Sequence, residues 1–115
     1  MKKINSEDFR NIVGDIDTLV FKFRGNKPII VDFYSETCKP CQQMMPIIED
    51  VEKMFGDRVE FYKIDADDNW ELANFFNVVG LPTLVMFHVE KERMQLAGLR
   101  TKDKLIGNIN KFYEF

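Results

Sequence analysis

Apolar positions recur along the chain at two spacings, and each spacing predicts a different kind of element. Near the N-terminus they follow the period of a helix, which we expect to be capped by Asn5 or Ser6 and to end before Phe21. The inward positions of this helix are Phe9, Ile12, Val13 and Ile16. The turn signal Gly25-Asn26-Lys27-Pro28 follows, so the chain is expected to reverse before its first long strand.

The middle of the chain joins a buried strand to a long helix. Ile29-Ile30-Val31-Asp32-Phe33-Tyr34 is an almost continuous apolar, β-branched run of central-strand length, and Asp32 is its one charged residue. A helix is expected to begin near Cys38, to kink at Pro46 and to be closed by Gly56. The apolar face of that helix consists of Cys41, Met44, Met45, Ile48, Val51 or Glu52, and Phe55.

The second half of the chain predicts three more strands and two more helices. Strands are expected at 59–64, 83–88 and 94–97, a short helix at 71–76, and a closing helix capped by Thr101. The order of elements is therefore α, β, α, β, α, β, β, α. This order predicts an α/β protein in which helices cover both faces of a central sheet.

Length and charge limit the kind of protein this can be. The 115 residues contain no repeat, low-complexity tract or linker, so residues 1–115 are expected to fold as a single domain. The chain has 16 Lys and Arg residues, 19 Asp and Glu residues and no basic cluster, so nucleic acid is not an expected partner. No apolar stretch approaches the roughly 20 residues that span a bilayer, and charges interrupt the N-terminal segment. We therefore predict a cytoplasmic protein that does not cross a membrane.

The only two cysteines, Cys38 and Cys41, lie where the buried strand gives way to the long helix. The partial positive charge and free N–H groups of a helix N-terminus stabilise a thiolate at Cys38, and Cys41 lies one turn further on the inward face. Such a pair can exchange disulfides: Cys38 attacks, a mixed disulfide forms, and Cys41 resolves it. The alternative is half of a zinc site, which needs about four ligands, and only His88 and carboxylates remain to supply the others. We expect no metal.

Several motifs follow one another along the chain: Val31–Tyr34, Cys38–Cys41, Pro46, Lys63–Asp65, Gly80–Thr83 and Gly98. Their order and spacing resemble the thioredoxin family. In that order they resemble the family's Val-Asp-Phe strand, its Cys-x-x-Cys motif, its helix proline, its Lys-x-Asp, its cis-proline loop and the glycine after its last strand. The resemblance implies the thioredoxin fold, with a central mixed sheet of four to five strands flanked by helices on both faces.

The resemblance implies catalytic roles for two charged residues, Asp32 and Lys63, whose sequence context also fits a purely structural role. Asp32 could be a strand-end residue that reaches water, but an isolated carboxylate inside an apolar strand is costly to bury. The resemblance implies that Asp32 accepts the proton of Cys41 during resolution. Lys63 resembles the family lysine that pairs with this carboxylate, although its pattern also fits an ordinary solvated strand lysine.

The resemblance also places a substrate-binding surface beside the cysteine pair. In the family a cis-proline faces the disulfide, and the residue before it, here Leu81, pairs its backbone with an extended substrate. The expected substrate-binding residues are Thr37, Lys39, Pro40, Leu81, Pro82 and Gly98. Thr37, Lys39 and Tyr34 depart from the family pattern, where the first two positions hold tryptophan and glycine. These departures leave the redox centre intact but change the surface that a substrate touches.

Three other features that could carry chemistry are interpreted as structural. The acidic run of Asp65, Asp67 and Asp68 is typical of a solvated loop. His88 ends an apolar strand and is assigned no role. Trp70, the only tryptophan, is expected near the start of the third helix and away from the disulfide.

These features together favour a thioredoxin-like protein-disulfide reductase. We expect it to act as a monomer on disulfide-containing protein substrates, to be recharged by thioredoxin reductase and to need no cofactor. The runner-up is a thiol oxidant or isomerase, for which a secretory signal would be typical, and none is expected here. A thioredoxin-fold binding module without turnover is a third hypothesis, against which the intact Cys38, Cys41 and Asp32 argue.

Overall fold

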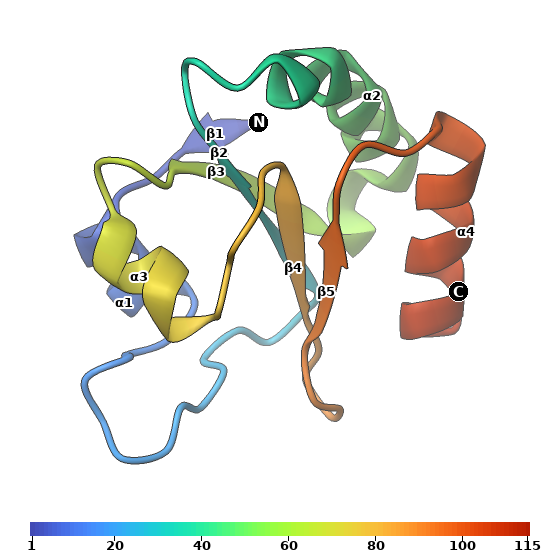
Figure 1. Ribbon diagram of the computed structural model, residues 1–115. Coiled ribbons are helices and arrows are strands. Elements are labelled where there is room, and N and C mark those ends of the chain that lie inside the picture. The colour runs from blue at the N-terminus through green and yellow to red at the C-terminus, as the bar shows by residue number, and fades with distance from the viewer.

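The centre of the fold is a five-stranded mixed sheet, seen in a computed structural model that describes residues 1–115 (Figure 1). The elements in chain order are β1 (Lys2–Lys3), α1 (Ser6–Ile12), β2 (Ile29–Tyr34), α2 (Lys39–Phe55), the 3₁₀ helix η1 (Gly56–Arg58), β3 (Glu60–Asp65), α3 (Trp70–Phe75), β4 (Thr83–Phe87), β5 (Met94–Ala97) and α4 (Lys102–Tyr113). The strand order is β1-β3-β2-β4-β5; β1, β3 and β2 are parallel, and β4 is antiparallel to both β2 and β5. The α/β architecture predicted from the order of elements is confirmed.

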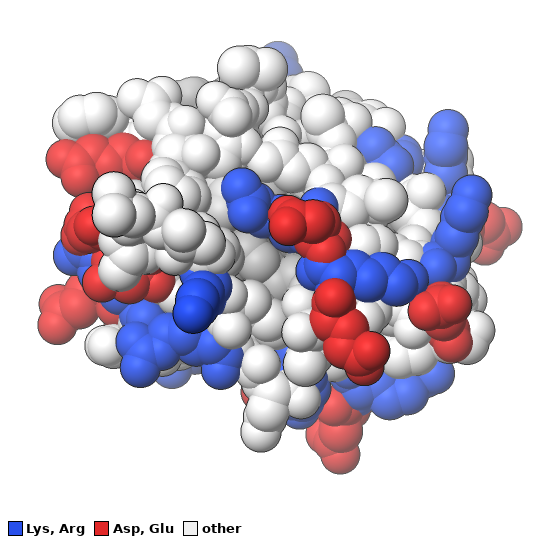
Figure 2. Space-filling model, turned by 90° about the horizontal axis from the view of Figure 1, so that it is seen from below, with Lys and Arg blue, Asp and Glu red and all other residues white.

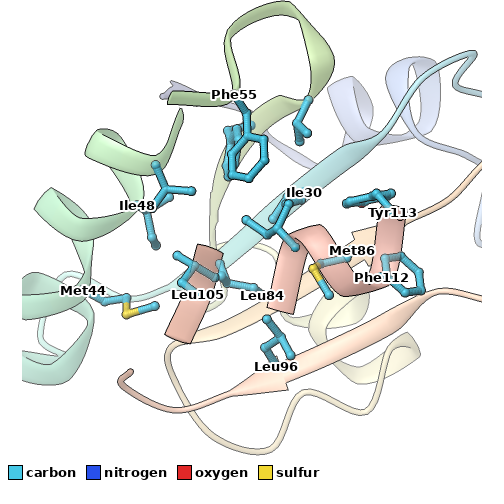
Figure 3. Close-up of a cluster of buried hydrophobic side chains, with 14 residues drawn as sticks. Ile30, Met44, Ile48, Phe55, Leu84, Met86, Leu96, Leu105, Phe112 and Tyr113 are labelled. Atoms are coloured by element: carbon cyan, nitrogen blue, oxygen red, sulfur yellow. The ribbon is translucent and has the colours of Figure 1, made fainter. Parts of the chain in front are cut away.

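Two apolar clusters fill the spaces between the sheet and its helices. On the face covered by α2 and α4, Ile30 and Leu84 of the central strands lie with Met44 of α2 and Leu105 of α4 (Figure 3). The opposite face, covered by α1 and α3, is packed mainly with aromatic and β-branched side chains, among them Phe9, Phe33, Phe76 and Phe87. Helices therefore cover both faces, as predicted.

Most predicted elements are present, and the differences lie mainly at their ends. β2 and β5 have the predicted bounds, while β3 and α3 are each displaced by one residue and β4 ends at Phe87. Asn5 rather than Ser6 caps α1, because its side chain accepts a hydrogen bond from the N–H of Asp8 at 2.9 Å. The short strand β1 is not predicted, because a pair of lysines carries no apolar signal.

The first helix is shorter than its apolar pattern predicts. It ends at Ile12, since the N–H groups of Val13 and Gly14 both donate to the carbonyl of Phe9, at 2.7 and 3.0 Å, and close the last turn. Ile16 still packs against the core, but from the irregular segment 14–28. The prediction was wrong because helical spacing indicates only that the apolar residues contact the same cluster. A segment without helical structure can make the same contacts.

Gly14 is expected to be required where segment 14–28 folds back toward α1. A Cβ at this position would lie 2.6 Å from the carbonyl oxygen of Lys22 and 2.7 Å from the ring of Phe21. Backbone atoms cannot give way cheaply, so Gly14→Ala should lower the free energy of unfolding by about 1–3 kcal/mol in urea titrations followed by circular dichroism. The matched control is Gly107→Ala in α4, where a Cβ meets nothing within 4 Å and alanine should be neutral or stabilising. Equal destabilisation by both would contradict the steric argument.

Charges of both signs are mixed at the end of the molecule away from α2. Figure 2 shows Lys and Arg side chains next to Asp and Glu side chains on this face. A surface of this kind lacks the single-sign field that attracts a polyanion. No helix in the structure combines the length and apolar character needed to cross a membrane.

Candidate active site

Cys38 and Cys41 lie at the start of α2, just beyond the carboxyl end of β2. Cys38 is the N-cap of the helix, and its Sγ accepts a hydrogen bond from the N–H of Cys41 at 3.2 Å. Pro40 occupies the first turn, where its missing N–H interrupts no helical hydrogen bond. The two sulfur atoms form a disulfide across this turn, with Cα atoms 5.2 Å apart. The Cys-x-x-Cys spacing thus brings both sulfurs to the helix N-terminus, as predicted.

The two cysteines differ in exposure. Cys41 is 2% exposed and belongs to the buried face of α2, whereas Cys38 is half-buried and has the exposed residues Lys39 and Pro40 beside it. The N–H groups of the first helical turn also point toward the N-cap position and favour negative charge there. Cys38 is therefore the more accessible cysteine of the pair, and Cys41 is the sheltered one.

Asp32 is a buried carboxylate in the centre of the sheet. It lies two residues from Ile30 on β2, so it points to the same face, toward α2. It is 1% exposed, and its Oδ1 has no hydrogen-bond partner. Burial raises the pKa of Asp32 to about 7, and the positive charge of Lys63 opposes the rise. A carboxyl that titrates near neutral pH is suited to proton transfer.

Lys63 forms no ion pair with Asp32, unlike the family lysine that it resembles. The two residues are register partners in β3 and β2, but the Lys63 ammonium lies over the ring of Tyr34, 5.6 Å from its centroid. Pairing with Asp32 would bury an ammonium under α2, whereas the ring face holds the cation while Lys63 stays partly exposed. Lys63 therefore influences the pKa of Asp32 only through the electric field of its charge, without a direct contact.

A shallow cleft connects the inner cysteine with solvent. It has a volume of about 260 Å³, and Tyr34, Cys41 and Lys63 are among the residues that line it. A larger hollow of about 460 Å³ lies at the other end of the molecule, between segment 14–28 and the β4–β5 turn. That hollow contains no cysteine, so the chemistry belongs to the smaller cleft.

The loop before β4 lies at the same end of the sheet as the disulfide. Thr83, the first residue of β4, pairs with Phe33 near the end of β2. The Leu81–Pro82 peptide bond is cis, and the carbonyl of Pro82 accepts a hydrogen bond from the N–H of Gly98 at 2.8 Å. Gly98 has φ +91°, a backbone conformation that favours glycine. The structure thus brings the predicted loop residues and Gly98 together at one edge of the site.

Asp65 is not the solvated residue that its acidic run indicates. It ends β3, is 5% exposed, and its Oδ1 accepts a hydrogen bond from the N–H of Asp67 at 2.9 Å. The rest of the run is exposed, as expected. His88 has a structural contact, because its Nδ1 accepts a hydrogen bond from the N–H of Glu90 at 2.9 Å. Neither residue lines the cleft beside Cys41.

Sequence reasoning missed Lys3 and the contacts of Tyr34. Lys3 is the register partner of Lys63, and the Tyr34 side chain raises the pKa of Lys3 by contact with its ammonium. The alternation of side chains along a strand is the signal that could have found Lys3. Met1 packs on the cluster under α2, and Lys3, two residues further on, is expected to face the same side of the sheet. Once the pairing of β1 with β3 is known, Lys3 is expected next to Lys63.

Trp70 fluorescence is expected to respond little to the redox state. Trp70 begins α3, is 61% exposed and does not line the cleft beside Cys41. Its emission should change by far less than twofold when dithiothreitol reduces the disulfide, because quenching by a disulfide needs close contact with the indole. Thr37→Trp, next to Cys38, is the positive control and should brighten several-fold on reduction. A similarly large rise in the parent protein would mean that Trp70 packs on the disulfide.

Comparison with known proteins agrees with this geometry. The family model described as Thioredoxin matches residues 1–111. The chain is 32% identical to a thioredoxin of Borreliella burgdorferi over 83% of this chain and 81% of that protein. It is 31% identical to the bifunctional thioredoxin reductase/thioredoxin of Mycobacterium leprae, over 74% of this chain and 19% of that protein.

The fold has a solved counterpart as well. The crystal structure of chloroplastic thioredoxin z superimposes with a TM-score of 0.78 at 26% identity, covering 96% of this chain and 92% of the other. The mixed sheet with helices on both faces is thus a fold that this chain shares with a solved thioredoxin. The chain belongs to the thioredoxin family of thiol-disulfide oxidoreductases, and Cys38 and Cys41 are its redox-active pair.

Proposed function

We propose that the protein reduces substrate disulfides by attack of Cys38 and resolution by Cys41. The Cys38 thiolate attacks one sulfur of the substrate disulfide, the other substrate sulfur leaves as a thiolate, and a mixed disulfide forms. Cys41 loses its proton and attacks the Cys38 sulfur, which releases the second substrate thiolate and closes the Cys38–Cys41 disulfide. The observation that carries this proposal is the half-exposed N-cap Cys38 bonded to the buried Cys41.

Asp32 is the proposed proton acceptor for Cys41. Both residues are buried on the α2 side of the sheet, whereas Glu36, the one carboxylate that lines the cleft beside Cys41, is exposed to solvent. Because burial raises the pKa of Asp32 to about 7, its carboxylate holds a proton far better than an ordinary aspartate and can still release it to water. The Cys41 proton can therefore move to Asp32 as the Cys41 sulfur attacks.

The proposed substrate surface surrounds Cys38. Thr37, Lys39 and Pro40 are all exposed beside it, and Lys39 is the only charged one of the three. Across the site, Leu81 is partly exposed and precedes the cis bond to Pro82, which leaves its backbone available to pair with an extended substrate segment. Gly98 supports this loop through its hydrogen bond to Pro82. Substrate contacts are thus expected from both sides of the disulfide.

A coupled reduction assay tests the proposed function. With NADPH, thioredoxin reductase and a disulfide-bonded protein such as insulin, the parent protein should sustain NADPH oxidation, and Cys38→Ser should not. An oxidant or isomerase would instead transfer its disulfide to reduced peptides and be a poor substrate of the reductase. A binding module would hold the substrate without turnover. Either of these results would overturn the reductase proposal.

Thioredoxin reductase is the proposed electron donor, and the name of the M. leprae relative, which combines the two proteins, supports that pairing. We place the protein in the cytoplasm, where a reductase can recharge a disulfide, since its only two cysteines form the redox pair. It is proposed to act as a monomer and as one domain over residues 1–115. Size-exclusion chromatography with light scattering tests the first statement, and a single unfolding transition by two spectroscopic probes tests the second.

A further inference from the structure

Three charged residues occupy one row of register partners across the sheet, and their side chains are on the side of the sheet that α2 covers. Lys3 of β1 is the register partner of Lys63 of β3, and Lys63 is the register partner of Asp32 of β2. Residues in register point to the same face of a sheet, so two ammonium groups and one buried carboxylate share the α2 side. Tyr34 also shares it, because it lies two residues beyond Asp32 on the same strand.

Tyr34 contacts the cation next to Asp32. The Lys63 ammonium lies over the Tyr34 ring, 5.6 Å from its centroid, and the Tyr34 phenol faces Lys3. Tyr34 is 5% exposed, so packing holds the ring still, whereas an unanchored lysine side chain is flexible. Tyr34, Lys63 and Cys41 line the same cleft. The ring therefore decides where in the cleft the Lys63 charge resides.

Lys63 is the one charged side chain that acts on Asp32. The β4 partner of Asp32 is Leu84, and the buried face of α2 presents Cys41 and Met44 at this level. The other charged groups nearby, which are Lys3, Glu36 and Asp65, act on Tyr34. The position of the Lys63 ammonium is therefore the main electrostatic influence on Asp32 apart from burial.

We propose that Tyr34 is a positioning residue for the resolving step: its ring holds the Lys63 ammonium in the cleft beside Cys41 and so fixes the field of that cation at Asp32. The proposal rests on the proposed role of Asp32 as proton acceptor. A lysine that lost the ring would extend into water, since entering the buried site would strip its hydration. The field at Asp32 would then weaken.

Two substitutions of Tyr34 separate the effect of its ring face on the pKa of Asp32 from the effect of its phenol group. The pKa of Asp32 is followed in the disulfide form by the NMR shift of its carboxyl carbon. Tyr34→Phe keeps the ring face and should leave the titration midpoint unchanged, whereas Tyr34→Leu should raise it by about half a pH unit because the stabilising cation is released. Tyr34→Met provides a second variant without a ring if the leucine protein folds poorly. An unchanged or lowered midpoint in the folded variants without a ring would overturn the proposal.

A double-mutant cycle shows whether Tyr34 acts through Lys63. Lys63→Met alone should raise the Asp32 midpoint at least as much as Tyr34→Leu does. Adding Tyr34→Leu to Lys63→Met should then change the midpoint no further, because there is no cation left to position. A rise of the same size with and without Lys63 would mean that Tyr34 acts by packing alone, which contradicts a positioning role.

A kinetic measurement separates this inference from the proposed function. The release of the second substrate thiol is timed in the parent protein and in Tyr34→Leu. The mixed disulfide at Cys38 is held at acidic pH, where the Cys41 thiol stays protonated, and jumps to a series of higher pH values start the reaction. If Asp32 accepts the Cys41 proton, the midpoint of this rate profile should shift upward together with the Asp32 midpoint. A shifted Asp32 midpoint with an unshifted rate profile would refute the proton role of Asp32 and leave the positioning of Lys63 intact. An unshifted Asp32 midpoint would refute the positioning itself.

Discussion

Cys38→Ser is expected to abolish disulfide reduction, and Cys41→Ser is expected to trap the protein on its substrate. Cys38 is half-buried at the N-cap of α2, where first-turn N–H groups stabilise a thiolate, so its loss removes the only accessible nucleophile. Cys41 is 2% exposed, so its loss leaves the first attack intact and removes the step that releases the substrate. Turnover in the coupled assay should fall to background for both variants.

Intact-protein mass spectrometry distinguishes the two losses. After incubation with a disulfide peptide, Cys41→Ser should carry one peptide as a covalent adduct that dithiothreitol removes, and Cys38→Ser should carry none. The double variant is the control for non-specific attachment. An adduct on Cys38→Ser but not on Cys41→Ser would reverse the assignment of the attacking and resolving cysteines.

Asp32→Asn should slow turnover while stabilising the fold. The amide cannot accept the Cys41 proton, so the resolving step should lose its general base, an effect typically of ~10²–10⁴-fold when that step limits the rate. The same change removes a carboxylate that is 1% exposed and has one oxygen without a hydrogen-bond partner. A neutral amide is cheaper to bury than an ionised carboxylate. Activity and stability are therefore expected to move in opposite directions.

The stabilisation by Asp32→Asn should depend on pH in a defined direction. Burial raises the pKa of Asp32 from 3.8 to about 7, so the folded protein holds this proton more tightly than the unfolded chain. Below about pH 4 the carboxyl is protonated in both states, and its ionisation costs no stability. Between pH 4 and 7 the unfolded chain releases the proton first, so the parent protein loses stability as the pH rises.

The full difference between Asp32→Asn and the parent protein is reached above pH 7. One pKa unit corresponds to about 1.4 kcal/mol, so the pH-dependent part of the gain should be on the order of 4 kcal/mol. Urea unfolding at several pH values measures it. Asp68→Asn, an exposed residue, is the matched control and should show no such trend. A constant difference from pH 4 to 8, or turnover equal to that of the parent protein, would contradict the proposed role of Asp32.

The sequence predicts those parts of the fold and site that depend on interactions between residues close together in the chain. The apolar run of β2 defines a central strand by its composition alone, and its observed bounds match the prediction. The redox site depends on residues within four positions of one another: Cys38 is the N-cap, Pro40 lies in the first turn, and Cys41 lies one turn after Cys38. Interactions of this range depend little on the remainder of the fold, so the sequence alone determined the redox pair and its place at a helix N-terminus.

Other features depend on contacts between distant segments and were set by the packing of the folded chain. The end of α1 and the burial of Asp65 depend on how remote parts of the chain pack, and local patterns predicted both wrongly. Lys63 was expected to pair with Asp32, yet its ammonium lies over Tyr34, and Lys3 joins the row only because β1 pairs with β3. A long side chain can extend in several directions at similar free energy, and the neighbours brought by the sheet select one of them. The sequence therefore determined which residues could react, and the packing of the sheet against α2 determined the charges around them.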